Sequence, residues 1–236
     1  GDGGGGGGGP LVDVVLDEAE QKGTGRWTAE MALALGVPCP VLAEAVFARS
    51  ASARRDLRSR LAGARSRAPG GAPPPPDLES DLRDALAAGV VLAFAQGLDL
   101  ILSTGRAHDW GVRLDRVARL WRAGCIIRIA FLDRLAQAVA GDGAEHVLLD
   151  EHFRGLVENA EGGLRRAVAL AAQSGVACPA LASSLAYLDT IRDDRLPHNL
   201  LQAQRDAFGA HRYHRTDRGG VFHTEWLGDG STRRMA

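Results

Sequence analysis

Lysine is the scarcest charged residue in this sequence. Lys22 is the only lysine, so 27 of the 28 basic residues are arginine. Together with abundant alanine and glycine, this bias is typical of a GC-rich genome, in which solvent-facing lysine positions readily become arginine. A compact ammonium group is not equivalent to a planar guanidinium group. Lys22 therefore either persists by chance or serves chemistry that requires an ammonium, and composition alone leaves both explanations open.

Several other features are rare or missing, and each excludes a class of protein. The three cysteines, Cys39, Cys125 and Cys178, are widely spaced, which favours free thiols in a reducing, cytoplasmic compartment over a disulfide framework. The 29 acidic residues nearly balance the basic ones, so no general attraction to nucleic acid or to an anionic membrane is expected. No apolar run approaches the roughly 20 residues of a membrane span. The chain starts with glycine and has no charged-then-apolar leader, so we expect no secretory signal.

Familiar catalytic motifs are absent as well. The sequence contains no GxSxG, HExxH or paired CxxC motif. The glycine-rich residues 1–10 cannot serve as a dinucleotide fingerprint, because no strand precedes them and no helix follows directly, and we predict a disordered segment there. The histidines have no cysteine or carboxylate at ligand spacing, so no metal site is expected.

What the sequence does contain is helical periodicity. Apolar residues recur at three- and four-residue steps, and the 45% hydrophobic content is that of an ordinary globular protein. The glycine- and proline-rich stretch Ala62–Pro76 must be a loop. The predicted helices are Trp27–Leu35, Pro40–Leu61, Leu78–Ser103, Leu114–Arg122, Cys125–Ala138, Leu149–Ser174, Pro179–Ile191 and Asn199–Phe208.

These elements predict an all-α protein. Residues 11–210 would form one helical domain, and residues 211–236 an irregular C-terminal tail with Val221–Trp226 as the only short extended candidate. An internal repeat is visible in GVPCPVLAEA (Gly36–Ala45) and GVACPALASS (Gly175–Ser184). In each copy a helix would end at glycine and the next would begin after proline. The period is too long for a solenoid and indicates a duplicated helical half around a shared core.

The densest functional signal is QKGTGRW, which contains Lys22 and Thr24. Its glycines allow backbone N–H groups to turn toward a ligand, and lysine, threonine and the start of a helix all favour a phosphate or carboxylate. It is not a Walker motif, because the lysine precedes the glycines. An ordinary glycine-rich helix start explains the same pattern without a ligand.

Three further residues are candidates for binding. Arg49 lies in the apolar stretch EAVFAR and, if buried, must be paired or face a cavity. Arg205 and His211 lie near the end of a predicted helix, where cations also serve merely to stabilise the helix terminus. An exposed arginine near a helix end is the corresponding alternative for Arg49. Cys125 is interpreted as a small buried hydrophobic residue rather than a nucleophile.

In this order, the segments KGTGRW, EAVFAR, RLWRAGCIIR, LLQAQRDAFGAH and GVFHTEW resemble the decarboxylating 6-phosphogluconate dehydrogenases. The resemblance runs from about Leu11 to about Leu227. It is to the C-terminal helical domain of that family, which is built from a duplicated set of helices and forms a homodimer. The sequence departs from the family at Arg26, where lysine is usual, and at Ala207, where tyrosine is usual; the lost aromatic at 207 could loosen packing between subunits.

The resemblance implies a role for each candidate residue. Lys22, Thr24 and Arg49 would bind the phosphate of 6-phosphogluconate, and Arg205 and His211 would reach into the active site of the partner subunit. In the family's reaction a hydride passes from C3 of the substrate to NADP, and loss of CO2 then gives ribulose 5-phosphate. The Rossmann domain that holds NADP, the lysine base and the glutamate acid belong to an N-terminal half that this chain lacks. The substrate and a second subunit are the implied partners, with no nucleic acid and no membrane.

Two interpretations from different classes therefore stay open. The chain is part of an active dehydrogenase of the pentose phosphate pathway, or it is a non-catalytic helical dimerisation module derived from that family. Alone the chain would be inactive, because hydride transfer requires the NADP-binding domain and proton transfer requires the lysine base and the glutamate acid. A relative acting on another phosphorylated sugar acid is less favoured, because the whole phosphate-binding set is retained.

Overall fold

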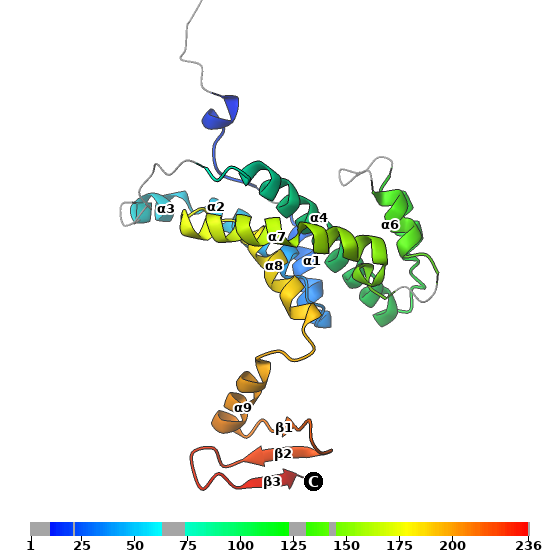
Figure 1. Ribbon diagram of the computed structural model, residues 1–236, viewed down its shortest axis with the longest axis vertical. Helices are drawn as coiled ribbons and strands as arrows, with labels where there is room; N and C mark the ends of the chain where they lie inside the picture. Colours follow the sequence, from blue (N-terminus) through cyan, green and yellow to red (C-terminus); the bar gives the residue numbers. More distant parts are fainter. Residues whose placement is uncertain (1–9, 21, 63–73, 123–130, 142–144, 236) are drawn as a thin grey trace, which may run out of the picture. The chain divides into compact units, whose positions relative to one another are not determined.

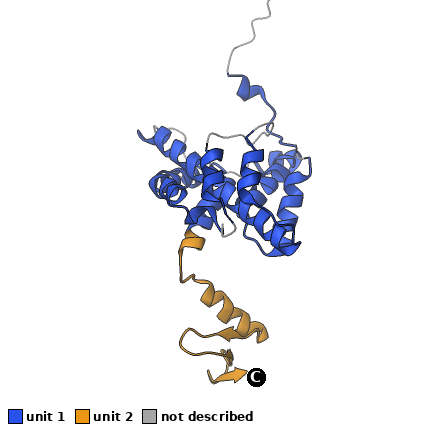
Figure 2. Cartoon of the chain, turned by 90° about the vertical axis from the view of Figure 1, so that its right-hand side faces the viewer, with its two compact units in different colours: residues 1–188 blue, residues 189–236 orange. Residues whose placement is uncertain are grey.

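The structure is a computed structural model that describes residues 10–20, 22–62, 74–122, 131–141 and 145–235. The chain divides into two compact units, residues 1–188 (unit 1) and residues 189–236 (unit 2), which Figure 2 colours separately. The predicted disordered segment falls on residues 1–10, nearly all of which lie outside the described residues, as do Cys125 and most of the predicted loop Ala62–Pro76.

The elements that begin in unit 1 are labelled in Figure 1 where space allows. In chain order they are the short 3-10 helix η1 (Leu11–Val14), α1 (Thr24–Leu35), α2 (Pro40–Ser52), α3 (Arg55–Ala62), α4 (Leu78–Ala107), α5 (Leu114–Leu120), α6 (Leu132–Ala138), the 3-10 helix η2 (Val147–Leu149), α7 (Glu151–Gln173) and α8 (Pro179–Arg192). The predicted helices in these regions are confirmed to within about one turn, except at two places.

One exception is the predicted helix Pro40–Leu61, which is wrong because the chain forms two helices there, α2 and α3. The Arg58 guanidinium donates a hydrogen bond to the Ser52 carbonyl oxygen at 2.9 Å. A carbonyl at the end of α2 thus finds a side-chain donor in place of the next helical turn. The other exception is Cys125–Ala138, of which only α6 lies within the described residues.

The core of unit 1 is built around α4, which makes its most extensive helix contact with α7. The fully buried Leu92 and Leu98 of α4 belong to one apolar cluster with Phe153 of α7 and Leu132 of α6. Burial of each such side chain contributes about 1.5–3 kcal/mol. A smaller cluster that contains Leu100 joins α4 to α1 and to the start of α2. This second cluster positions α1 and α2, which carry Thr24 and Arg49, and Lys22 lies just before α1.

By length and composition α4 is also long and apolar enough to cross a membrane, contrary to our expectation that no run comes close to a span. An 18-residue window within Leu78–Ala107 has a mean hydropathy of 2.0, and half of that window is buried inside the protein. The packing against α7 accounts for this apolar composition, because a helix that is apolar on most sides suits the middle of a helical core.

The two copies of the repeat have the same local structure. Gly36 follows α1 with φ 67°, and Gly175 follows α7 with φ 65°, both in the left-handed region that favours glycine. The residue after each glycine donates its N–H to the carbonyl five residues earlier, at 2.9 Å in the first copy and 2.8 Å in the second. Both are the hydrogen bonds that end a helix at a left-handed glycine.

The two copies also pack on the same helix through equivalent leucines. A Cβ added to Gly97 of α4 would lie 4.0 Å from Leu42 Cδ1, and one added to Gly89 would lie 3.0 Å from Leu181 Cδ2. Leu42 and Leu181 occupy the same position in the two repeats. The duplicated helix pairs α1–α2 and α7–α8 therefore share α4 as their common support.

The first copy is fixed to α4 by polar contacts as well. The Cys39 thiol donates to the Gln96 backbone carbonyl at 3.4 Å, and the Gln96 side-chain oxygen accepts from the Val41 N–H at 3.0 Å. Burial, and then the nearby Asp99 carboxylate, raise the pKa of the Cys39 thiol to about 11. The thiol stays protonated at neutral pH and acts as a structural donor that holds the start of α2.

Unit 2 contains α9 (His198–Gly209) and a three-stranded antiparallel sheet of β1 (Tyr213–His214), β2 (Val221–Thr224) and β3 (Thr232–Met235) in that order. Phe222 pairs with Tyr213 on one side and with Arg234 on the other. The predicted extended segment Val221–Trp226 is confirmed as β2, but the tail is more regular than expected. The two outer strands of the sheet were not predicted, because β1 is only two residues long and β3 is rich in arginine.

Candidate functional site

The first part of the site is the loop at the start of α1. Gly23 has φ 98°, and no side chain caps the helix. The Trp27 N–H bonds the Gly23 carbonyl at 3.0 Å, so the N–H groups of the first turn before it have no acceptor within the helix. The first turn contains no acidic residue. Thr24 therefore begins a helix whose positive end is open to an anion.

Two contacts place this loop against the second half of α2. A Cβ added to Gly25 would lie 3.0 Å from Val46 Cγ2. On the other side of the loop, the Ala19 N–H donates to the Ser52 hydroxyl at 2.9 Å. Ala19 therefore lies beside the C-terminal end of α2, and Gly25 lies beside Val46, further back in the same helix.

In the sequence, Lys22 lies midway between Ala19 and Gly25, and Arg49 lies midway between Val46 and Ser52. The contacts of Ala19 and Gly25 thus bring the chain on either side of Lys22 against the half of α2 that contains Arg49, 27 positions away from Lys22 in the sequence. Both cations are exposed, so Arg49 needs no buried partner. Within the described ranges no carboxylate lies within salt-bridge distance of either. Two unpaired cations and open helix N–H groups form a surface suited to a phosphate or carboxylate.

The departure at Arg26 leaves this arrangement intact. Its guanidinium lies 3.5 Å from the Glu30 carboxylate, one turn further along α1, and both side chains are 63% exposed. Such an exposed pair contributes little to stability. Arg26 is therefore engaged along its own helix rather than with Lys22 or Arg49.

A separate group of candidate residues lies in unit 2, where Gln202 connects the surroundings of Arg205 and His211. Arg205 Nη1 donates to Gln202 Oε1 at 3.1 Å, and Gln202 Nε2 donates to the Arg212 carbonyl at 2.5 Å. His211 is exposed and lines an open hollow with Gln202 and Tyr213. In the described part of unit 2 neither Arg205 nor His211 bonds a carbonyl at the end of α9, so the helix-terminus explanation gains no support.

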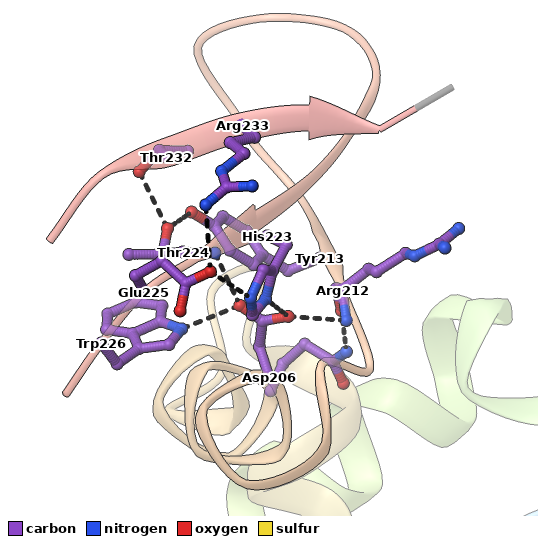
Figure 3. A network of polar contacts seen from close by, with 10 residues as sticks. Asp206, Arg212, Tyr213, His223, Thr224, Glu225, Trp226, Thr232 and Arg233 are labelled. Atoms are coloured by element: carbon purple, nitrogen blue, oxygen red, sulfur yellow. Dashed lines mark hydrogen bonds and ion pairs between the residues drawn. The ribbon is translucent and has the colours of Figure 1, made fainter. Parts of the chain in front are cut away.

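A residue that sequence reasoning missed, Asp206, fixes this segment. As Figure 3 shows, its carboxylate receives hydrogen bonds from four donors on three parts of unit 2. Oδ1 accepts from the Arg212 N–H at 2.8 Å and from His223 Nδ1 at 2.9 Å. Oδ2 accepts from the Thr224 N–H at 3.0 Å and from Trp226 Nε1 at 2.8 Å. A single side chain thereby ties α9 to the loop after it and to β2.

Asp206 is completely buried, and its charge is maintained by these donors. Burial raises the pKa of Asp206, but the hydrogen bonds outweigh this effect and hold the pKa far below its usual range. The backbone next to His211 is bent accordingly, with positive φ at Ala210 (50°) and Arg212 (63°). The signal for this network was present in the sequence as an aspartate beside Arg205, but its donors lie up to 20 residues away and only the fold brings them together.

Polar contacts continue from this network into the sheet. The Tyr213 hydroxyl lies 2.6 Å from Thr224 Oγ1, which lies 2.8 Å from Thr232 Oγ1. One side chain from each strand is therefore linked in a row across the sheet. The position of His211 after α9 thus depends on a continuous set of polar contacts rather than on apolar packing.

The described residues do not suit a nucleotide cofactor or a metal. Their one sheet is short and antiparallel, whereas a dinucleotide site requires a parallel βαβ unit with a glycine-rich turn. Among them no group of three or more histidine, cysteine or acidic residues is placed to hold a metal ion. We therefore derive no hydride-transfer step through residues of this chain.

These features define a helical domain with an uncapped helix start and two exposed cations at α1 and α2, and a C-terminal segment built around a buried carboxylate. Comparison with known proteins names the domain. Residues 3–226 match the family model for the 6-phosphogluconate dehydrogenase C-terminal domain, and the chain belongs to this family. The expected resemblance and the all-α class are thereby confirmed.

Its relatives are enzymes of about twice this length. The chain is 43% identical to the NADP(+)-dependent, decarboxylating 6-phosphogluconate dehydrogenase of Bacillus subtilis and 43% identical to the decarboxylating enzyme of Synechococcus elongatus, covering 92% of this chain and 47% of each relative. It is also similar to the solved structure of Plasmodium falciparum 6-phosphogluconate dehydrogenase, studied in its apo form, with NADP+ and with 6-phosphogluconate. That similarity has a TM-score of 0.86 and 40% identity, over 92% of this chain and 47% of the solved one.

Proposed function

We propose that this chain provides the substrate-binding and dimer-forming part of an NADP-dependent 6-phosphogluconate dehydrogenase. The reaction is the oxidative decarboxylation of 6-phosphogluconate to ribulose 5-phosphate and CO2. One observation carries the proposal, namely that the open start of α1, with Lys22 just before it, packs against the half of α2 that carries Arg49, and that neither cation pairs with a carboxylate of the described residues. The relatives named for this activity, and the substrate present with the solved neighbour, support it.

In this proposal the chain binds the part of the substrate that does not react. Lys22 and Arg49 hold the phosphate dianion with charge-assisted hydrogen bonds, and Thr24 supplies a hydroxyl and the first N–H groups of α1. Binding a remote phosphate orients the carbon atoms that react elsewhere in the enzyme. NADP is bound mainly by residues outside this chain.

The proposed dimer shares its active sites, with Arg205 and His211 reaching the partner subunit's substrate. The surface of unit 2 supports this arrangement. Large apolar side chains of unit 2 are strongly exposed, among them Leu200 (75%), Phe208 (80%) and Leu227 (90%). Such a surface is costly to leave in water and suits a contact with a second subunit. A cytoplasmic location is also proposed, and the free thiols of Cys39 and Cys178 support it.

The test uses the natural gene product that contains this chain. Each charge-assisted contact contributes about 1.5–3 kcal/mol, so Lys22→Ala should lower kcat/KM for 6-phosphogluconate by about 10- to 150-fold. The KM for NADP should stay unchanged, because the nucleotide is bound elsewhere. Lys22→Arg should also be impaired if the site requires a compact ammonium.

Arg26→Lys is the matched control, because Arg26 is the neighbouring cation and pairs only along its own helix. It should leave kcat/KM unchanged. Wild-type activity of Lys22→Ala would overturn the assignment of the phosphate site. A wild-type protein that neither binds nor oxidises 6-phosphogluconate would favour the dimerisation module.

A further inference from the structure

The segment that follows Arg49 carries positive charge that the described structure leaves unneutralised. Arg54, Arg55 and Arg60, at and within α3, are exposed. No carboxylate among the described residues lies within salt-bridge distance of these three guanidinium groups. Arg58, by contrast, forms an ion pair with Asp17. We refer to Arg54, Arg55 and Arg60 as the arginine patch.

The arginine patch directly adjoins the phosphate site. The turn between α2 and α3 is tight, because the Ala53 N–H bonds the Arg49 carbonyl at 3.3 Å and the Arg54 N–H bonds the Ala51 carbonyl at 3.1 Å. All three patch arginines line one open hollow of about 510 Å³ that begins at Ala53. The first residue that lines the hollow, Ala53, therefore lies one helical turn after Arg49.

Two of the acidic groups near the arginine patch interact with Arg58. Asp17 pairs with Arg58, and Glu18 also acts electrostatically on Arg58. Arg55 contributes to the low pKa of Asp17 only after Arg58 does. Asp56 is the one acidic residue that lines the hollow. The local charge of the patch is thus positive, although the whole chain has a net charge of −1.

We propose that the arginine patch attracts the phosphorylated sugar acid toward the site of Lys22 and Arg49 and raises its local concentration there. This inference rests on the proposed function, because it takes that anion as the substrate. A substrate with a phosphate dianion and a carboxylate responds strongly to local potential, and the near-zero net charge of the chain supplies no attraction at long range. The patch side chains are exposed, and no carboxylate of the described residues holds them in one position. They therefore suit attraction of the substrate by charge better than a contact of fixed geometry.

The experiment replaces the patch by neutral residues in the natural gene product. We expect Arg54→Gln/Arg55→Gln/Arg60→Gln to lower kcat/KM for 6-phosphogluconate about 10-fold at low ionic strength. The difference from wild type should shrink to less than about 2-fold near 0.5 M salt, where charges are screened within a few ångströms. The kcat and the KM for NADP should be unchanged, which also shows that the variant is folded.

Two matched variants separate charge from structure. Arg106→Gln/Arg116→Gln/Arg119→Gln removes the same charge from exposed positions on α4 and α5 and should behave as wild type. Arg54→Lys/Arg55→Lys/Arg60→Lys keeps the charge and should retain the wild-type kcat/KM at every ionic strength.

Any one of the following outcomes would overturn the proposal. An equal loss in the α4–α5 control would show that overall charge alone matters. A loss that persists at high salt, or a lysine variant as poor as the glutamine variant, would indicate direct guanidinium contacts instead of attraction by charge. Wild-type protein inactive toward 6-phosphogluconate would refute the proposed function, and with it this inference, whereas an active wild type with an unaffected patch variant would refute the inference alone.

Discussion

Units 1 and 2 are stabilised by opposite means. Unit 1 encloses fully buried leucines and Phe153 around α4, whereas the described part of unit 2 buries Phe222 as its one large apolar side chain and places the carboxylate of Asp206 at its centre. Apolar packing is shared among many contacts, so it tolerates small changes in a graded way. A buried carboxylate depends on each of its donors. A single substitution should therefore reduce the stability of the two units in different ways.

The largest effect is expected in the apolar core of unit 1. Phe153→Ala should lower the free energy of unfolding by about 3–5 kcal/mol, because it leaves a cavity beside α4 and α6. Urea unfolding followed by circular dichroism measures this loss. Phe47→Ala is the matched control, because Phe47 is 64% exposed, and it should change stability by less than about 0.5 kcal/mol. Equal effects of the two substitutions would contradict the location of the core.

A smaller loss, confined to unit 2, is expected from Asp206→Asn. The amide cannot accept from all four donors at once, and its own N–H groups would oppose two of them, so we expect a cost of about 2–4 kcal/mol. Amide hydrogen exchange should show faster opening of β2 (Val221–Thr224), while exchange in α4 stays as in wild type. Loss of protection throughout α4 would show that the two units do not unfold separately.

The low pKa of Asp206 adds a pH dependence with a defined sign. Its folded pKa lies below the unfolded value, so the stabilisation is fully present above about pH 4 and is lost as pH falls below it. The opening of β2 should therefore accelerate in acid, and Asp206→Asn should remove much of this acceleration. Asp217→Asn, which alters only an exposed pair with Arg215, should leave opening at neutral pH nearly unchanged.

The smallest effects compare the two copies of the repeat. Gly97→Ala should gain about 0.5–1 kcal/mol from helix propensity, because its new Cβ would meet Leu42 at an ordinary distance of 4.0 Å. Gly89→Ala should gain less or lose stability, because Leu181 would have to move away from a 3.0 Å contact. Thermal unfolding of the two variants gives the difference directly. A greater stability of Gly89→Ala would contradict the tighter packing of the second copy.

The distance along the sequence between interacting residues explains much of what the sequence could predict. Helices such as α4 and α7 follow from apolar periodicity, and the shared conformation of Gly36 and Gly175 follows from the repeat, because these signals lie within a few residues of one another. The break between α2 and α3 was missed although its contact is local, because apolar periodicity does not reveal the side-chain hydrogen bond from Arg58 to the Ser52 carbonyl. The buried role of Asp206 was missed because its donors come from distant positions.

The residues of the candidate site also differ in how far their roles could be predicted from the sequence. A phosphate-binding role for Lys22 and Thr24 could be proposed from the glycines beside them, which is local chemistry. The approach of Arg49 to this loop could not be derived from spacing, since it depends on the contacts of Ala19 with Ser52 and of Gly25 with Val46. Resemblance to the family supplied the proposed phosphate-binding role of Arg49, which its apolar neighbours in the sequence marked only as a candidate.

The most direct test of the shared active site mixes two impaired variants of the natural gene product. Lys22→Ala subunits should be combined with Arg205→Ala subunits, and the heterodimer purified and assayed with 6-phosphogluconate. If Lys22 and Arg205 of one site come from different chains, each heterodimer contains one intact site and should regain about half of the wild-type activity. Verified heterodimers that regain no activity would contradict the shared site.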